Sequence, residues 1–431
     1  MTCRSLVIPL TLGAGLGLTG PLPAGLGGDI DDMVDGSVRR APYDPATVRK
    51  TVEFWEWRVR KSPGRFLEHR ELAGAYLARQ RETGDAEDAV RAERAARRSL
   101  ELLERGNAAA LTRLARSLLG QHRFPEALEA ARRCAELDPA AGLLVADVEL
   151  ELGHDLQARG AFAKAGVDPD HPSALVLRAR FAQADGDLDG ALRCLRQAAR
   201  QADELSDLPA EAAAWFHVMV GHTLIDRGRL DEGSVACRTA LAIFPRDYRA
   251  MTGLAEAAAW RGEWDEVVAW GRRAVEASSQ DPEALALLAE ALSKLGHKEE
   301  SERRIQQLNE LAHSFPRIYD RHWALFCADN DRNLDEAYAL ARKDIELRQD
   351  AGAYETLAWA AFKKGLAAEA DAALRKALER PPQTASFFRH AEAIARAAGR
   401  PAQADAFRAR ARELNPYIVK ATQLSKPGAA E

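Results

Sequence analysis

Aromatic residues are scarce in this sequence, at 6% of 431 residues, and only five cysteines are present: Cys3, Cys134, Cys194, Cys237 and Cys327. No two cysteines have the spacing of a metal-binding or redox motif, so they do not indicate a disulfide framework. We expect the last four, which lie in helical segments, to be small core residues. The net charge of −5 provides no overall field for holding nucleic acid, so a nucleic-acid partner is disfavoured.

Recognisable catalytic and cofactor motifs are also missing. The sequence has no H-E-x-x-H, G-x-S-x-G or phosphate-binding Gly-Lys-Ser/Thr motif. His217 and His222 are five residues apart, which does not place them together on a helix face for binding a metal. A G-x-G-x-x-G motif at 15–20 is followed by Pro21 and Pro23, where a dinucleotide-binding turn needs the start of a helix. We therefore expect no catalytic residue, no cofactor and no metal, and predict that the protein is not an enzyme.

Residues 1–28 have the composition of a signal peptide or membrane leader. Residues 5–28 contain no charged side chain and follow Arg4, as in a secretory signal. The prolines and glycines in this stretch argue against a stable membrane-spanning helix. A cleaved signal, an uncleaved anchor and a cytoplasmic leader all stay open. We expect an extracytoplasmic location, whether secreted, periplasmic or membrane-tethered, with a cytoplasmic location as the alternative.

Two short segments follow the leader. Residues 29–44 are acidic, then basic, and contain Gly, Pro and Asp, which predicts a linker. Residues 45–63 are predicted to form an N-terminal capping helix that ends near Ser62-Pro63-Gly64. Its packed face consists of four apolar residues at helical spacing: Val48, Val52, Trp55 and Val59.

A repeat of 34 residues organises the rest of the chain. The stretch 214–247 predicts two short antiparallel helices separated at Gly228, and a shift of 34 residues brings the same pattern of apolar and small residues back. The starting points that align this pattern are 66, 108, 139, 172, 214, 248, 282, 318, 351 and 385. One helix pair cannot bury its own apolar face, so the pairs must stack on one another. We predict an all-α, right-handed α-solenoid of about ten helix pairs.

The period and pattern over residues 66–416 resemble the tetratricopeptide repeat family. Small and apolar residues match its positions in most units, as in Leu72, Ala73, Tyr76, Leu114, Ala115, Leu118, Ala127, Gly186, Ala191, Leu288, Ala289, Leu292, Gly296, Leu357, Ala358, Ala361, Gly365, Ala370, Ala377, Gly399, Ala404 and Ala411, with Pro139, Pro245 and Pro416 after second helices. The sequence departs from the family where Arg178 takes an apolar position and where Gly233, Val267 and Ser301 replace the usual alanine. The unit at 139–171 matches least well.

Two steps between units are longer than the others. Residues 79–106 extend a helix pair without adding a third hydrophobic run, and residues 200–214 insert an acidic, proline-containing loop. The second insertion predicts a bend between two subarrays. The resulting division is a first subarray at 64–200, an inter-array loop at 201–213, a second subarray at 214–416 and a C-terminal tail at 417–431.

The resemblance implies a concave wall formed by the first helix of each pair. In the family's phase, positions two, five, nine, twelve and thirteen of a unit face inward. These positions hold aromatic residues and a histidine that we predict to bind a partner: Trp215, His222, Trp260, Tyr319, Phe326, Trp359 and Phe362. The alternative is that some of them pack between adjacent repeats. The ninth positions do not reproduce the Lys and Asn of the family members that clamp chaperone tails.

These observations predict a non-enzymatic scaffold or adaptor for protein interactions, which binds an extended peptide or a protein partner on the concave surface. One alternative is a self-assembling envelope scaffold, in which the arginine-rich end of the array docks onto the acidic loop of another copy. The other is an accessory or regulatory subunit of an enzyme complex. Homo-oligomers stay possible, and membrane contact is expected only through an uncleaved leader.

Overall fold

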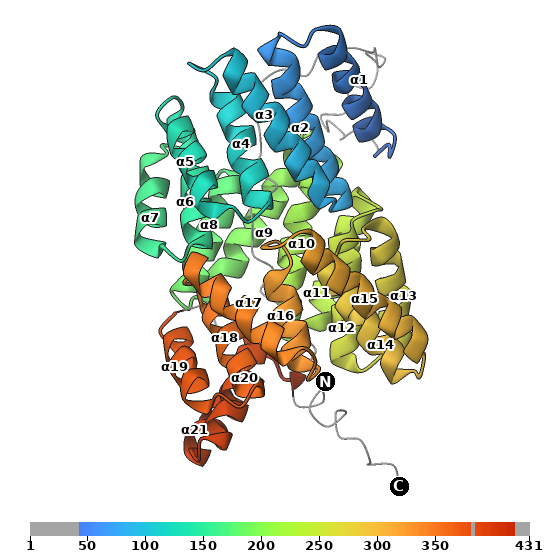
Figure 1. Cartoon of the computed structure of the whole chain (residues 1–431), viewed down its shortest axis with the longest axis vertical. Helices are drawn as coiled ribbons and strands as arrows, with labels where there is room; N and C mark the ends of the chain where they lie inside the picture. Colours follow the sequence, from blue (N-terminus) through green and yellow to red (C-terminus); the bar gives the residue numbers. More distant parts are fainter. Residues whose placement is uncertain (1–42, 381–383, 419–431) are drawn as a thin grey trace.

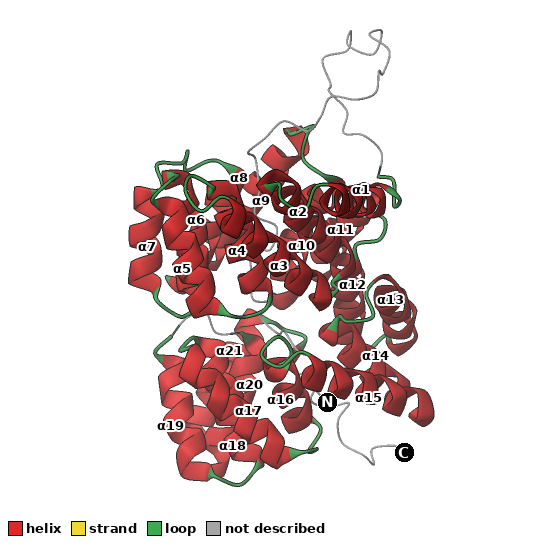
Figure 2. Cartoon of the chain, turned by 45° about the horizontal axis from the view of Figure 1, so that its top comes forward, coloured by secondary structure: helices red, strands yellow, loops and turns green. Residues whose placement is uncertain are grey.

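The computed structural model describes residues 43–380 and 384–418. The predicted leader at 1–28, nearly all of the linker and most of the C-terminal tail lie outside the described residues. Within the described part, the chain forms 21 α-helices and one short 3₁₀ helix, and no strand (Figure 2). None of these helices is both long enough and apolar enough to cross a membrane.

The helices form one cap and ten consecutive pairs. Helix α1 (Thr47–Lys61) is the cap. The pairs are α2 (Phe66–Thr83) with α3 (Ala86–Leu102), α4 (Ala108–Gly120) with α5 (Phe124–Ala135), α6 (Gly142–Glu151) with α7 (Asp155–Lys164), α8 (Pro172–Ala184) with α9 (Leu188–Glu204), α10 (Ala210–Asp226) with α11 (Leu230–Ile243), α12 (Tyr248–Arg261) with α13 (Trp264–Ala277), α14 (Pro282–Lys294) with α15 (Lys298–Ser314), α16 (Asp320–Asp329) with α17 (Leu334–Leu347), α18 (Ala351–Lys363) with α19 (Ala367–Leu378), and α20 (Ala385–Ala397) with α21 (Pro401–Leu414).

This architecture confirms the predicted all-α solenoid of ten pairs. Seven of the ten predicted starting points coincide with the first residue of a helix: 66, 108, 172, 248, 282, 351 and 385. The unit at 139 begins with the 3₁₀ turn Pro139–Ala141 before α6. The other two first helices begin at Ala210, four residues before the predicted start, and at Asp320, two residues after it.

The pair of α12 and α13 shows how the sequence specifies one unit. Asp247 caps α12 by accepting hydrogen bonds from the backbone N–H groups of Arg249 and Ala250. Gly262 ends the helix in the left-handed region, with a φ of 80°, which glycine adopts without steric cost. The chain then turns back along α12. Local caps and a glycine turn therefore set the length of each helix.

Small residues let the two helices of a pair approach closely. A Cβ atom on Gly233 of α11 would lie 2.9 Å from the carbonyl oxygen of Gly221 on α10, and a Cβ atom on Gly221 would lie 2.6 Å from the Cys237 sulfur. Even an alanine at either position would force the helices apart. The glycine at 233, unusual for this position of the repeat, is thus explained by the close contact with Gly221.

The two long steps are absorbed by longer helices. Helices α2 and α3 are 18 and 17 residues long, so the first insertion lengthens this pair. At the second, α9 and α10 extend from both sides into the predicted inter-array loop and leave only 205–209 as the connection. One cluster of buried residues continues across it, from Ala146 to Ala236. The core is therefore continuous at this connection.

Successive turns of the superhelix are in contact. Residues close to 195 positions apart meet repeatedly: the Gln280 side chain donates to the Asp85 carboxylate, His122 meets the Arg317 carbonyl, and the Gln349 N–H donates to the Leu152 carbonyl. Farther along, Asn415 donates to the carbonyl of Ile225, 190 residues earlier. We call these contacts the inter-turn seam. Figure 1 shows the consequence, with the orange and red helices α16 to α21 lying against the end of the earlier turn.

Candidate functional site

The first helices of successive pairs place equivalent side chains in a row. We call the residues at the inward positions of α10, α12, α14, α16 and α18 the inner wall. Its ninth positions are His222, Glu256, Glu290, Phe326 and Trp359. The row changes character along the array, because its first three members are ionisable and its last two are aromatic. The two parts differ in their chemistry and are described separately.

The predicted binding residues are largely covered. Trp260 is only 1% exposed and Trp359 is 9% exposed, and Trp215, His222, Tyr319 and Phe326 are also buried, whereas Phe362 is half-buried. Their partners belong mostly to the repeat array itself. The Phe326 ring stacks on Trp323 with centroids 5.7 Å apart. As the protein stands, these aromatic rings contribute to packing, and their proposed contact with a partner stays a prediction.

Tyr319 is one of the buried inner-wall residues, and it contacts a residue of the inter-turn seam. The Tyr319 hydroxyl donates to the Gln280 side-chain oxygen at 3.3 Å, and Gln280 in turn bonds to Asp85 and to the backbone of Ala86 in the preceding turn. An open groove was expected to leave Tyr319 facing solvent. In the stacked superhelix, Gln280 instead joins Tyr319 to the seam.

The first part of the inner wall centres on a buried charge pair. His222 Nδ1 lies 3.5 Å from a carboxylate oxygen of Glu256, and its Nε2 lies 3.0 Å from the carbonyl oxygen of Arg249. Burial lowers the pKa of His222, but the hydrogen bond and negative charge of Glu256 outweigh burial and raise the pKa to about 9. A pKa of about 9 favours the cationic form of His222 at neutral pH.

Additional carboxyl groups surround this pair. Thr252 donates to Asp281 at 2.5 Å, and burial raises the pKa of Asp281. Burial and the adjacent Asp281 carboxylate also raise the pKa of Glu283 well above its usual value. Raised carboxyl pKa values report excess negative charge in a poorly hydrated place. This part of the wall therefore favours a positively charged group.

Two polar atoms on α12 lack hydrogen-bond partners among the described residues. They are one carboxylate oxygen of Glu256, Oε1, and the indole nitrogen of Trp260, Nε1, and both are buried. The residues are four apart, so they share one face of the helix. Buried polar groups in folded proteins are almost always paired, because leaving one unpaired costs about 1–3 kcal/mol. An acceptor and a donor thus stand side by side on the inner wall without partners.

The second part of the wall is a stack of rings. The rings of Trp359 and His390 have centroids 4.2 Å apart and planes within 15° of parallel, and Phe362 stacks on Trp359 at 5.4 Å. The Trp359 indole donates to Asp329 at 2.7 Å, and His390 Nδ1 lies 3.0 Å from Glu355. These groups come from α16, α18 and α20, so the stack joins three consecutive units.

A family model for the tetratricopeptide repeat matches residues 351–384, which contain α18 and α19. This segment of the chain is a tetratricopeptide repeat. No curated protein matches its sequence. The ring stack around Trp359 thus includes side chains of the matched repeat, and the other nine helix pairs follow the same order of a first and a second helix.

Several solved structures are similar to this chain at low identity. A tetratricopeptide repeat protein from Parabacteroides merdae is 19% identical, with a TM-score of 0.35, and covers 59% of this chain and 98% of its own. The type IV pilus biogenesis factor PilW is 17% identical, with a TM-score of 0.37, and covers 49% and 94%. The Cut9–Hcn1 hetero-tetramer of the APC/C is 13% identical, with a TM-score of 0.35, and covers 88% and 92%.

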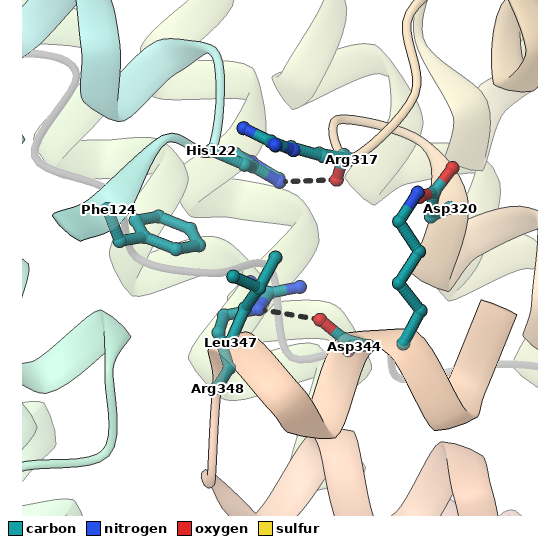
Figure 3. Close-up of a pocket in the computed structure, with 8 residues that line it drawn as sticks. His122, Phe124, Arg317, Asp320, Asp344, Leu347 and Arg348 are labelled. Atoms are coloured by element: carbon teal, nitrogen blue, oxygen red, sulfur yellow. Dashed lines mark hydrogen bonds and ion pairs between the residues drawn. The ribbon is translucent and has the colours of Figure 1, made fainter. Parts of the chain in front are cut away.

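The repeats also create a small pocket at the inter-turn seam (Figure 3). His122, after α4, points across the seam to Arg317, and both residues have positive φ values, 54° and 77°. The pocket is lined by His122, Phe124, Arg317, Asp320, Lys343, Asp344, Leu347 and Arg348. Burial and the positive charge of Arg348 lower the pKa of His122 to about 3, so the ring is neutral.

Arg348 contacts three other residues in and around this seam pocket. Its guanidinium bonds to Asp344 at 3.0 Å, lies 4.0 Å from Glu151 of the preceding turn and sits 5.1 Å from the centre of the Phe124 ring. Figure 3 shows it beneath Phe124 and beside Asp344. Sequence reasoning missed this site, because residues so far apart in the chain share no local pattern. A metal has no donor set here, since the described residues contain no cluster of three metal-binding side chains.

The arginine-rich end of the last repeats is mostly paired internally. Arg408 and Arg396 both contact Glu392, Arg400 contacts Asp371, and Arg410 contacts Glu413. These pairs reduce the positive charge available to an acidic loop of another copy. Assembly of that kind stays a prediction.

Proposed function

We propose that the protein is a non-enzymatic scaffold whose inner wall binds an extended segment of a protein partner. The tetratricopeptide-repeat fold is typical of proteins that bind other proteins. The observation that supports the inner wall as the site is the pair of unpaired atoms on α12, Glu256 Oε1 and Trp260 Nε1. A peptide group offers one N–H donor and one carbonyl acceptor, which is the complement of this pair.

The charge of the wall selects the kind of segment. Asp281 and Glu283 have raised carboxyl pKa values near the His222 and Glu256 pair. A lysine or arginine of the partner placed beside them would lower those pKa values and remove the cost of crowding negative charges. The partner segment is therefore expected to be extended and to carry a basic side chain.

The packing of the rings determines how such a segment gains access. Trp260 and Trp359 are buried, and Tyr319 is held by Gln280 of the seam. A segment that contacts the rings must therefore displace side chains that now touch one another. Binding at the inner wall is expected to loosen the inter-turn seam.

The test uses the full-length chain with Glu256→Gln and Trp260→Phe combined, which removes the charge and the indole N–H with little change in shape. The matched control is Glu266→Gln with Trp270→Phe, an identical i, i+4 pair on the outer helix α13. Tagged proteins are produced in the native cells, and captured polypeptides are identified by mass spectrometry. Peptides from each captured partner are then titrated by fluorescence anisotropy.

We expect a partner peptide to bind the wild type and the control with equal affinity, and to bind the Glu256 and Trp260 variant roughly tenfold more weakly. A loss of about 1–3 kcal/mol of buried hydrogen bonding corresponds to such a decrease in affinity. Circular dichroism of all three proteins must agree. Equal binding by the variant and the wild type would place the partner elsewhere and reject the inner wall.

We also propose that the protein works outside the cytoplasm, because residues 5–28 are uncharged and follow Arg4. Cell fractionation combined with mass spectrometry of the N-terminus tests this. Recovery in the cytoplasm with the N-terminus intact would contradict it.

A further inference from the structure

Helix α1 carries an exposed stripe that the repeat packing does not use. Phe54 is 49% exposed and Trp57 is 45% exposed, and their rings lie 6.2 Å apart, although both residues are large and apolar. On the opposite side, Val52 is buried against the array. The helix therefore has two apolar faces, of which only one packs on α2.

Lysines continue this stripe at both ends. Lys50, Phe54, Trp57 and Lys61 are spaced i, i+4, i+7 and i+11, so all four lie along one side of the helix over about 16 Å. All four are exposed. Neither lysine is within ion-pair distance of an acid in the described residues, whereas Arg49, Arg58 and Arg60 of the same helix each contact a glutamate.

The charge of α1 differs from that of the whole chain. The helix has five basic and two acidic side chains, whereas the full sequence has a net charge of −5. The helix also lies at the end of the described array, where it packs on α2, and its Phe54 and Trp57 side is exposed among the described residues (Figure 1). A basic apolar surface is thus concentrated at one end of an acidic molecule.

We propose that this stripe docks onto an anionic lipid surface. Phenylalanine and tryptophan insert at the boundary between headgroups and acyl chains, and the lysines on either side reach lipid phosphates with their ammonium groups. The stripe runs along the exposed side of a single helix, which suits a flat membrane better than a peptide. The segment 5–28, which is uncharged, precedes α1 in the chain and would hold it near the bilayer if it remains attached.

The first measurement is cosedimentation of the full-length protein with vesicles of phosphatidylcholine, with and without phosphatidylglycerol. Two variants remove the stripe: Phe54→Ser with Trp57→Ser, and Lys50→Glu with Lys61→Glu. The matched controls are Leu156→Ser with Val235→Ser, which removes two exposed apolar residues elsewhere, and Lys294→Glu with Lys298→Glu, which makes the same charge change elsewhere.

We expect binding to the anionic vesicles that falls about tenfold or more in either stripe variant and stays unchanged in both controls. Binding should also weaken with added salt. The leader could bind vesicles by itself, so a second measurement follows the stripe directly. Brominated lipids should quench the fluorescence of the wild type, and Trp57→Phe should bind equally well and lose most of that quenching.

Three results would overturn the proposal. One is equal vesicle binding by the wild type and both stripe variants. Another is quenching that is unchanged in Trp57→Phe, which would show that α1 does not touch the lipid. The third is a dimer in light scattering that Phe54→Ser with Trp57→Ser dissociates, without any anionic vesicle binding by the wild type, which would assign the stripe to a second copy.

Discussion

Gln280 accepts a hydrogen bond from the backbone N–H of Ala86 at 3.0 Å, although the two residues are 194 positions apart in the chain. Its amide nitrogen also donates to Asp85, the residue that caps α3. The loop before α14 thereby contacts the N-terminus of a helix in the preceding turn. These two hydrogen bonds connect successive turns of the superhelix at this point of the inter-turn seam.

The seam can be tested through Gly84, which has a φ of 72° and whose added Cβ would lie 2.5 Å from the Ser278 hydroxyl. Gly84→Ala combines the cost of a left-handed alanine, about 1–2 kcal/mol, with a clash across the seam of about 1–3 kcal/mol. The control is Gly106→Ala, because Gly106 has a φ of 73° and open space around it. Urea unfolding should show a larger decrease in the free energy of unfolding for Gly84→Ala than for Gly106→Ala. Equal decreases for the two variants would mean that contact between the turns does not contribute to stability at Gly84.

Glu82 makes the stability of the fold sensitive to pH. Burial and the nearby Glu211 raise the pKa of Glu82 from its usual 4.5 to about 7. A carboxyl group whose pKa is higher in the folded than in the unfolded state lowers the free energy of unfolding. This loss grows as the pH rises from the unfolded-state pKa to the folded-state pKa. Glu82→Gln, which can still accept the hydrogen bond from Tyr43, should therefore gain stability relative to the wild type between about pH 4.5 and 7.

The measurement for Glu82→Gln is the urea midpoint at several pH values across this window, with the exposed Glu104→Gln as the control. Below about pH 4.5 the wild type and Glu82→Gln should be almost equally stable, since the wild-type carboxyl is then protonated in both states. A constant difference at every pH would contradict the assignment.

His222 should have the opposite pH dependence. Its pKa is raised to about 9 by Glu256, so protonation stabilises the folded state fully below pH 6.5, and this contribution is lost as the pH rises through about 9. His222→Gln should cost on the order of 2–3 kcal/mol below pH 6.5 and progressively less in alkaline solution. Stability measured by urea unfolding at both ends of the range checks this. A cost that grows with pH would show that the ring is neutral in the folded protein.

Trp359→Phe tests the ring stack without removing its packing. The variant keeps an aromatic ring beside His390 but loses the indole donor to Asp329, which should cost about 1–3 kcal/mol. The control is Trp270→Phe on α13, where the Trp270 ring contacts Arg273 at the surface. This substitution should lower the free energy of unfolding by about 1 kcal/mol or less. Chemical unfolding of both variants gives the comparison. Equal effects would imply that the bond to Asp329 contributes nothing.

The sequence determined the local architecture in detail. The 34-residue period predicts ten helix pairs, and seven of the predicted starts are the observed first residues, because caps such as Asp247 and glycine turns such as Gly262 act within a few residues. The repeat phase also predicts which positions face inward, since every unit repeats one geometry. Boundaries were less accurate around 205–209, where α9 and α10 lengthen into a stretch whose proline and acidic residues suggested a longer loop.

Only the tertiary structure decided what the inner wall faces. The small rotation between one repeat and the next accumulates over about 195 residues until a loop meets an earlier turn, as Arg348 meets Glu151 and Gln280 meets Asp85. No local sequence pattern predicts this accumulated rotation, because each repeat contacts mainly its neighbours. A slight change in the rotation between successive repeats would separate the turns. That accumulated rotation, together with packing between neighbouring units, buries most of the aromatic residues for which the repeat pattern left open both a groove and packing between repeats.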